Sequence, residues 1–244
     1  MGTTLFASDV HLSAQRPDII TLFIDLLGRA KQVEHLYLLG DCFDRYLGDD
    51  DTTAPNPAII EALRDLTKSG VPVSVVQGNH DFLFGANFSE MTGCTLLPDH
   101  CVIEVNGTRV LIMHGDTLCI DDHSYQTFRS YSREPGNQQV FLAKSLEERI
   151  VEAERIRKQS KQATQLKTND IMDVNQEAVL SAMCEHSVSL LLHGHTHRPA
   201  IHNFLIDDEH ARRIVLGDWY ERDTLLLWDD NGYRFSTVAD LAMS

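Results

Sequence analysis

Apolar residues in the first part of the chain alternate between short continuous runs and longer amphipathic stretches. The runs at 3–8, 35–39 and 72–77 are typical of buried strands, whereas 18–31 and 56–69 repeat apolar residues at helical spacing. Pro57 lies near the start of the second stretch and Gly70 follows it, as expected for the two ends of a helix. This strand–helix order predicts parallel strands with helices on the faces of the sheet.

The second half of the chain is richer in strand patterns. Apolar runs at 101–105 and 109–113 flank Asn106-Gly107, a dipeptide that strongly favours a two-residue hairpin turn. A helix is predicted over 173–186, and strands over 188–192, 200–206, 213–216 and 224–228, with a further strand candidate at 233–237. We therefore expect an α/β fold, a layered sandwich built on two mixed sheets.

Residues 123–167 depart from this rhythm, because they lack strand patterns and are largely helical in periodicity. Between 129 and 167 nine basic residues outnumber five acidic ones, in a chain whose net charge is −15. The segment also carries an apolar stripe, formed by Val140, Phe141, Leu142, Leu146, Ile150, Val151 and Ile156. We predict a core of residues 1–122 and 168–244 with a helical cap inserted at 123–167. The alternative is an ordinary amphipathic helical pair packed on the sheet.

Composition narrows the functional classes. The acidic net charge disfavours a general nucleic-acid-binding protein, which needs a basic surface. The five cysteines are odd in number and form no Cys-x-x-Cys pair, which favours reduced thiols. No window approaches the roughly 20 apolar residues of a membrane-spanning helix.

Five fragments place residues of metal-ligand type directly after apolar runs. They are Asp9-Val10-His11, Gly40-Asp41, Gly78-Asn79-His80-Asp81, His114-Gly115-Asp116 and Gly194-His195-Thr196-His197. Ligands gather at the carboxyl ends of parallel strands, so these side chains are expected to converge. Oxygen and imidazole donors without a thiolate favour Mn²⁺ or Fe²⁺ over structural zinc. Two such ions, roughly 3.5–4 Å apart, activate a shared hydroxide for in-line attack on a phosphate ester or anhydride.

The spacing within the fragments suggests roles. Asp41 is the candidate bridging carboxylate, because it lies alone between two ligand-bearing strands. The pair Asp9 and His11 is separated by two positions, as is the pair His195 and His197, so each pair should face one side of a strand end. Three more residues are expected to orient the ligands or cap loops: Asp81, Asp116 and His193.

Together the fragments resemble the calcineurin-like metallophosphoesterase superfamily, whose pattern is Asp-x-His, Gly-Asp, Gly-Asn-His-Asp, His and Gly-His-x-His. The resemblance spans residues 9–197. It implies a four-layer αββα sandwich with metal ligands on loops at the strand ends.

Longer strings resemble the UDP-2,3-diacylglucosamine pyrophosphatases, a Gram-negative family of lipid A biosynthesis. They lie at 41–44, 48–51, 111–119, 171–176 and 193–199. The resemblance implies hydrolysis of the pyrophosphate bond of UDP-2,3-diacylglucosamine to 2,3-diacylglucosamine 1-phosphate (lipid X) and UMP, by attack on the α-phosphate. It further implies two Mn²⁺ ions, a UDP-linked diacylated glucosamine lipid as substrate, and a cytoplasmic protein peripheral to the inner membrane. We expect a monomer that binds no nucleic acid.

Family roles carried over by position assign the first metal to Asp9, His11, Asp41 and His197, and the second to Asp41, Asn79, His114 and His195. The implied substrate contacts are Asn79, His80, Asp122, Ser160, Thr164, Lys167 and His195, and the implied catalytic residues are His80 and Asp41. Lys167 offers a charge for a phosphate, and the apolar stripe could take acyl chains.

Two positions depart from the narrower family. His80 stands where that family usually has Arg, and Thr164 where Asn is more usual. Because His80 matches the wider superfamily, a general phosphoesterase acting on nucleotides or phosphoproteins is an alternative. A catalytically inactive scaffold is a third.

Overall fold

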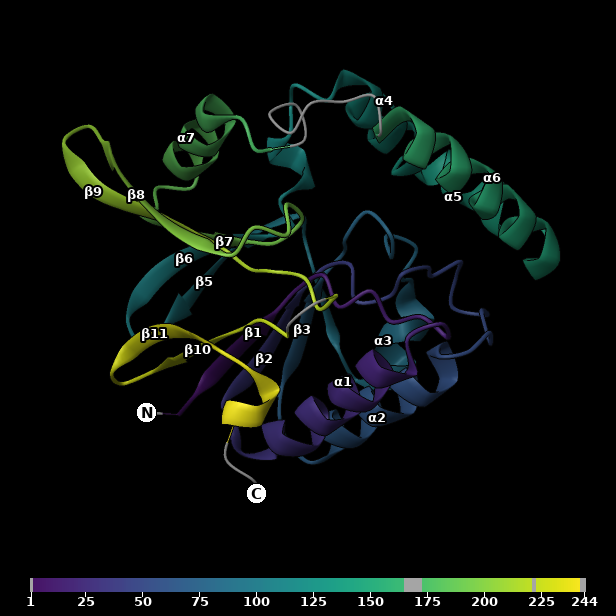
Figure 1. The fold of residues 1–244 in the computed structure, drawn as a ribbon, viewed down its shortest axis with the longest axis horizontal. Coiled ribbons are helices and arrows are strands. Elements are labelled where there is room, and N and C mark those ends of the chain that lie inside the picture. Colours follow the sequence, from purple (N-terminus) through teal and green to yellow (C-terminus); the bar gives the residue numbers. More distant parts are fainter. Residues whose placement is uncertain (1, 165–172, 221–222, 242–244) are drawn as a thin grey trace.

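The computed structural model describes residues 2–164, 173–220 and 223–241, and its strands form two mixed sheets (Figure 1). The six-stranded sheet has the order β11-β10-β1-β2-β3-β4. Its parallel strands are β1 (Thr4–Ala7), β2 (His35–Leu39), β3 (Val73–Val76) and β4 (Thr95–Leu97). The hairpin of β10 (Leu225–Asp229) and β11 (Gly232–Ser236) extends it, antiparallel to β1.

The five-stranded sheet has the order β5-β6-β7-β9-β8. Its central strands β6 (Thr108–Met113), β7 (Leu190–His193) and β9 (Glu209–Val215) are parallel, and β5 (His100–Val105) and β8 (Ala200–Ile206) are antiparallel edges. The β5–β6 turn has φ of 49° at Asn106 and 77° at Gly107. Positive φ at both positions is what a type I′ hairpin requires, so the predicted turn is confirmed.

Helices cover the outer face of each sheet (Figure 1). The six-stranded sheet packs against α1 (Pro17–Arg29), α2 (Asn56–Lys68) and α3 (Ala86–Thr92), with one apolar cluster between them. The five-stranded sheet packs against α7 (Gln176–Glu185) through another cluster. A third cluster lies between the sheets. These layers confirm the predicted αββα sandwich.

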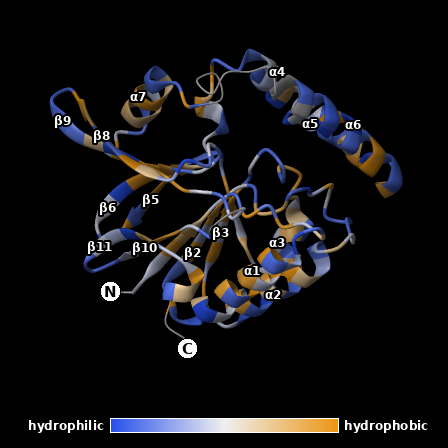
Figure 2. Cartoon of the chain, in the orientation of Figure 1, coloured by the Kyte–Doolittle hydropathy of each residue, from blue (hydrophilic) through white to orange (hydrophobic). Residues whose placement is uncertain are grey.

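Strand β1 shows why apolar residues run continuously in the core strands. Leu5 and Ala7 point to the helix side, whereas Phe6 between them points to the other sheet, and all three are fully buried. A strand covered on both faces cannot alternate apolar with polar residues. The hydropathy colouring shows this apolar interior beneath polar outer surfaces (Figure 2).

Some predicted element boundaries were wrong. The helix predicted over 173–186 begins only at Gln176, because the Asn175 side chain caps it by accepting hydrogen bonds from the backbone of Glu177 and Ala178. Strand β9 starts at Glu209, before the predicted start at 213. The pattern missed its first residues because most of them are polar. The elements α3 and β4 were missed, since seven and three residues are too few to show a period.

The segment predicted as a cap forms the helices α4 (His123–Ser132), α5 (Pro135–Leu142) and α6 (Leu146–Thr164). Arginines attach them to the sandwich: Arg129 bonds Asp116, Arg149 bonds Asp50, and Arg157 bonds Asp44. Figure 1 shows α5 and α6 extending beside the sandwich. The proposed boundaries at 123 and 167 stay a prediction.

Within the described residues, no helix has both the length and the apolarity needed to cross a bilayer.

Candidate metal centre

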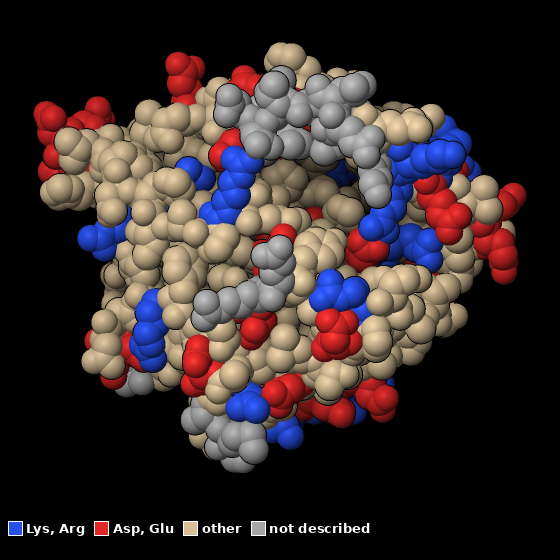
Figure 3. All heavy atoms as spheres, in the orientation of Figure 1, with Lys and Arg blue, Asp and Glu red and all other residues tan. Residues whose placement is uncertain are grey.

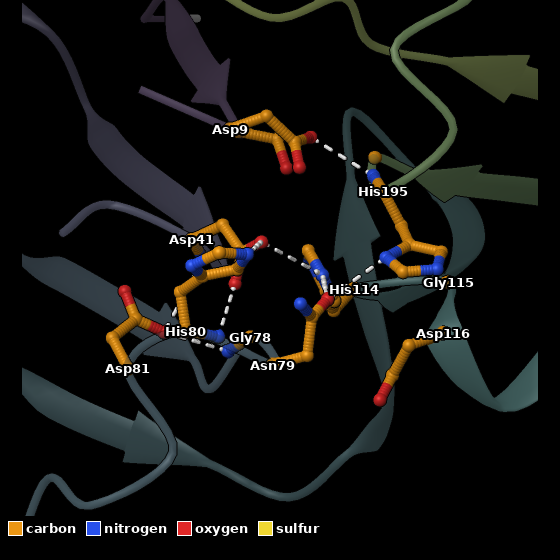
Figure 4. Close-up of polar contacts among 12 residues, drawn as sticks. Asp9, Asp41, Gly78, Asn79, His80, Asp81, His114, Gly115, Asp116 and His195 are labelled. Carbon is orange, nitrogen blue, oxygen red and sulfur yellow. Dashed lines mark hydrogen bonds and ion pairs between the residues drawn. The ribbon is translucent and has the colours of Figure 1, made fainter. Parts of the chain in front are cut away.

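All five sequence fragments meet at one edge of the sandwich (Figure 4). They occupy the loops that follow β1, β2 and β3 of the first sheet, and β6 and β7 of the second. Backbone hydrogen bonds join the first two loops, since Asp9 N donates to Gly40 O and His11 N to Asp41 O, at 3.1 and 2.9 Å. The structure therefore brings side chains from across the sequence into a single centre.

The backbone is strained at this centre. Five of the predicted ligands have positive φ: 55° at Asp9, 51° at His11, 52° at Asp41, 68° at His195 and 58° at His197. The left-handed region is uncommon for residues other than Gly, and such strain of order 1–3 kcal/mol per residue gathers at functional sites. Asp9 and His11 reach one ligand group, as expected, although not by alternation along an extended strand. Left-handed turns, not strand alternation, set the directions of these side chains.

Two glycines permit the close approach of these loops. A Cβ atom on Gly78 would lie 2.1 Å from Oδ1 of Asp41, and one on Gly194 would lie 2.2 Å from Oδ2 of Asp9. No side chain fits at either contact, so both positions need glycine.

Asp41 lies at the middle of the centre. Its Oδ2 is 3.6 Å from Nε2 of His114, 3.9 Å from Nε2 of His11 and 3.9 Å from Nε2 of His80. Its Oδ1 accepts a 2.8 Å hydrogen bond from the backbone of His80. The carboxylate is buried and reaches toward imidazoles from three loops, which is the geometry expected of a bridging ligand.

The other predicted ligands form two groups around Asp41. In one, Nε2 of His197 lies 3.2 Å from Oδ1 of Asp9 and 3.3 Å from Nε2 of His11. In the other, Oδ1 of Asn79 lies 2.8 Å from Nε2 of His114 and 2.9 Å from Nδ1 of His195. These groups correspond to the two ligand sets that the sequence resemblance implies.

The donors fit divalent cations. Oδ1 of Asp9 is buried beside the imidazole of His197, and no Lys or Arg in the described ranges pairs with Asp9 or Asp41. Buried carboxylates without a cation are costly. Burial raises the pKa of the nearby Cys42 thiol well above its usual value. Carboxylate, amide and imidazole donors suit borderline metals.

The pKa shifts of the histidines in the centre favour a bound cation. Burial lowers the pKa of His11 to about 4 and that of His195 to about 4, so both imidazoles are neutral and able to coordinate. Burial also opposes protonation of His114, but Asp41 and Asp9 outweigh it and raise its pKa to about 9. A proton on His114 balances the two carboxylates, which a bound cation would do in its place.

Hydrogen bonds behind the ligands fix their orientation. Nδ1 of His114 donates to Leu39 O at 2.9 Å, which directs Nε2 into the centre. Nδ1 of His197 lies 2.8 Å from Oδ2 of Asp218, so this carboxylate orients His197. The ring of Tyr220 stacks on His11 at 5.3 Å between centroids.

Sequence reasoning missed Asp218 and Tyr220. They follow the strand predicted at 213–216, so the strand-end rule that found the five fragments applied to them too. No paired His or Gly-His motif marked them.

The three residues expected to support the ligands make different contacts. Asp81 accepts hydrogen bonds from the backbone nitrogens of Asp41, Cys42, Phe43 and Gly78, so it caps two ligand loops. Asp116 accepts from Tyr125 and Arg129 and connects the centre to α4. Nδ1 of His193 lies 2.8 Å from Gly194 O, and its Nε2 lies 3.2 Å from Nη1 of Arg213.

The predicted substrate contacts are only partly described. Oδ1 of Asp122 caps α4 by accepting from Tyr125 N at 3.0 Å, and Ser160 is exposed on α6. His80 donates from Nδ1 to Asp44 O at 3.0 Å, leaving Nε2 directed at Asp41. Lys167 and the side chain of Thr164 lie outside the described residues. The roles of all these residues stay predictions.

The family of the chain follows from comparison with known proteins. Residues 2–199 match the calcineurin-like phosphoesterase family. The chain belongs to this family and is an enzyme of the hydrolase class.

Individual relatives show a more specific similarity within this family. The chain is 46% identical to a UDP-2,3-diacylglucosamine hydrolase of Pseudomonas entomophila, covering 95% of this chain and 97% of that protein. It is 46% identical to the UDP-2,3-diacylglucosamine hydrolase of Escherichia coli O81, covering 91% of this chain and 93% of the relative. The similarity therefore extends beyond the ligand loops to nearly the whole chain.

Proposed function

We propose that this enzyme hydrolyses the pyrophosphate bond of UDP-2,3-diacylglucosamine in lipid A synthesis, releasing 2,3-diacylglucosamine 1-phosphate and UMP. The observation that carries the proposal is the convergence of two ligand groups on the buried Asp41, in a chain similar over nearly its full length to relatives named for this substrate. Two Mn²⁺ ions are the proposed cofactors, because the donor set mixes carboxylate, amide and imidazole.

We propose that each ligand group holds one metal ion. Asp9, His11 and His197 would hold one ion, and Asn79, His114 and His195 the other, with Asp41 shared. When bound, such ions polarise phosphate oxygens and lower the pKa of coordinated water.

His80 is the residue that we propose to act on the substrate's phosphate. Its side chain is 32% exposed, whereas that of Asp41 behind it is 2% exposed. Its bond to Asp44 O fixes the ring, so Nε2 faces the centre where a phosphate would lie. From there it can donate a hydrogen bond to a phosphoryl oxygen or to the leaving phosphate.

The α4–α6 segment is the proposed cap for the lipid part of the substrate. Tyr131, Val140, Leu142 and Val151 are large apolar residues that it exposes, and they could contact acyl chains or a membrane surface. Arg157 adds a fixed positive charge beside Asp44, near His80. Basic side chains gather on this part of the surface, interspersed with acidic ones (Figure 3). Attraction to an anionic inner-membrane surface is therefore proposed for this segment.

The test is release of UMP from UDP-2,3-diacylglucosamine by the purified chain with Mn²⁺, compared with the same protein in excess chelator. UDP-N-acetylglucosamine, which lacks the long acyl chains, is the matched control substrate. We expect rapid metal-dependent release only from the lipid. Equal turnover of both sugar nucleotides would refute lipid specificity, and faster turnover of p-nitrophenyl phosphate or cyclic nucleotides would favour a general phosphoesterase.

A further inference from the structure

A cavity of about 200 Å³ lies beside the loop that carries His195 and His197. Its polar lining consists of Asp173, Thr196, Arg198, His202 and Arg213. The volume equals that of roughly six or seven waters, at about 30 Å³ each. This is enough space for one small oxyanion with some solvent.

Arg213 is the most unusual residue of this cavity. It is 7% exposed on β9, and the one side-chain hydrogen bond that it makes to a described residue joins Nη1 to Nε2 of His193, at 3.2 Å. Among the described residues, its Nε has no hydrogen-bond partner and no carboxylate lies within ion-pair distance of the guanidinium. The other buried arginine, Arg149, pairs with Asp50, and the partly buried Arg129 pairs with Asp116. A buried guanidinium without an anion is costly, so the lack of a carboxylate partner among the described residues favours a bound anion.

The described neighbours provide no counter-ion for Arg213. His202 lies directly opposite Arg213 in the β8–β9 ladder, where burial and the guanidinium lower the pKa of its imidazole. Asp173 is the carboxylate of the lining, and Nη1 of Arg198 already binds its Oδ2 at 2.7 Å. The lining therefore keeps a net positive charge within a chain of net charge −15.

We propose that this cavity binds a small oxyanion of phosphate type, held by Arg213 and Arg198. A guanidinium matches the geometry of phosphate oxygens and offers paired donors. The site is separate from the metal centre and does not depend on the proposed substrate. Because Thr196 lines it and His193 contacts Arg213, the bound anion would stabilise the strand end that precedes His195.

The test is a calorimetric titration of the full-length, chelator-treated protein with inorganic phosphate at constant ionic strength. Removing metal prevents phosphate from binding at the other centre. Arg198→Gln should weaken binding about tenfold, since it removes a charge-assisted hydrogen bond. Asp173→Asn should tighten binding by about threefold or more, because it frees Arg198 and removes the repelling charge. Arg213→Gln should abolish binding if the variant folds.

The matched control is Arg212→Gln. Arg212 is the neighbour of Arg213 on β9 but bonds Asn203 and Tyr233 at the exposed surface, so phosphate affinity should stay unchanged. A parallel titration with glucosamine 1-phosphate distinguishes a phosphate ester from the free ion as the preferred ligand. No phosphate binding by the unmodified chain, or equal affinities across Arg198→Gln, Asp173→Asn and Arg212→Gln, would overturn the proposal.

Discussion

Asp41 lies between the two ligand groups, with Oδ2 3.9 Å from Nε2 of His11 and 3.6 Å from Nε2 of His114, so its replacement tests the centre most directly. Asp41→Asn keeps the shape and the hydrogen bond from His80 but removes the negative charge between the imidazoles. We expect turnover below about a tenth of the unmodified rate, because neither ion keeps a bridging carboxylate. Metal content, measured by elemental analysis of the purified protein, should fall in parallel. Retention of both ions and of a tenth or more of the activity would contradict the bridging role.

Asp218 acts on the centre through another residue. Its carboxylate lies 2.8 Å from Nδ1 of His197, so Asp218→Asn leaves the ligand in place but weakens its orientation and basicity. Loss of such a partner typically reduces metal affinity about 10–100-fold. A Mn²⁺ titration followed by electron paramagnetic resonance should show this loss for one ion only. Asp218→Glu should partly restore affinity, and Asp25→Asn, which removes a surface pair with Arg29, is the control.

His80 offers a comparison between the wider and narrower families. Its Nδ1 donates to Asp44 O, whereas Arg at this position would project a permanent charge toward the centre. We predict that His80→Arg raises the rate on the lipid substrate, if the fixed cation stabilises the phosphate better than imidazole does. The measurement is the initial rate of UMP release at saturating Mn²⁺. An unchanged or lower rate would indicate that Arg157, already near Asp44, supplies the charge that is needed.

At the scale of elements, Arg149 holds α6 to the sandwich. Its side chain is 2% exposed and bonds Leu47 O and Asp50, although Asp50 itself is 67% exposed. Arg149→Met should keep the packing of the stem but lose these bonds, at a cost of about 1–3 kcal/mol.

The consequence of Arg149→Met should be local. We expect faster hydrogen exchange in α6 and in the loop around Asp50, with little change in the central strands. Arg155→Met is the matched control, because Arg155 bonds only the neighbouring Gln159 on the exposed face of α6, as far as the structure describes it. Uniformly faster exchange throughout the sandwich would show that α6 does not open independently.

The elements themselves divide into those that sequence patterns reveal and those that they do not. Strands β2 and β8 have the predicted bounds, because each ends directly before turn residues, at Gly40 and at Asp207. The short α3 and β4 could not be predicted from the sequence. Contacts with α2 and β3, rather than a local period of apolar residues, determine their structure. Tertiary packing overrides weak propensity in such segments.

At the scale of the whole molecule, the convergence of the five fragments was easier to predict than the contacts of the residues around them. Parallel strand order alone brings the ends of β1, β2 and β3 together, so the ligands could be inferred before their geometry was known. The contacts of Asp218 with His197, and the unpaired burial of Arg213, depend on where distant strands lie in three dimensions. The left-handed backbone at five ligands was also hidden, because Asp and His carry no such requirement in their sequence.

The centre joins the two sheets, so metal should stabilise the whole molecule. Asp9, Asp41 and Asn79 follow strands of the six-stranded sheet, whereas His114 and His195 follow strands of the other. An ion present at 100 times its Kd stabilises the folded state by about 2.7 kcal/mol per site. For a chain of this length, that corresponds to a rise in Tm of roughly 5–10 °C.

Calorimetric scans with Mn²⁺ and with excess chelator should show this difference, and it should shrink strongly in Asp41→Asn. Equal Tm values with and without metal would mean that the sheets do not depend on the centre for their attachment. The apolar cluster between the sheets would then hold the sandwich without help from the ions.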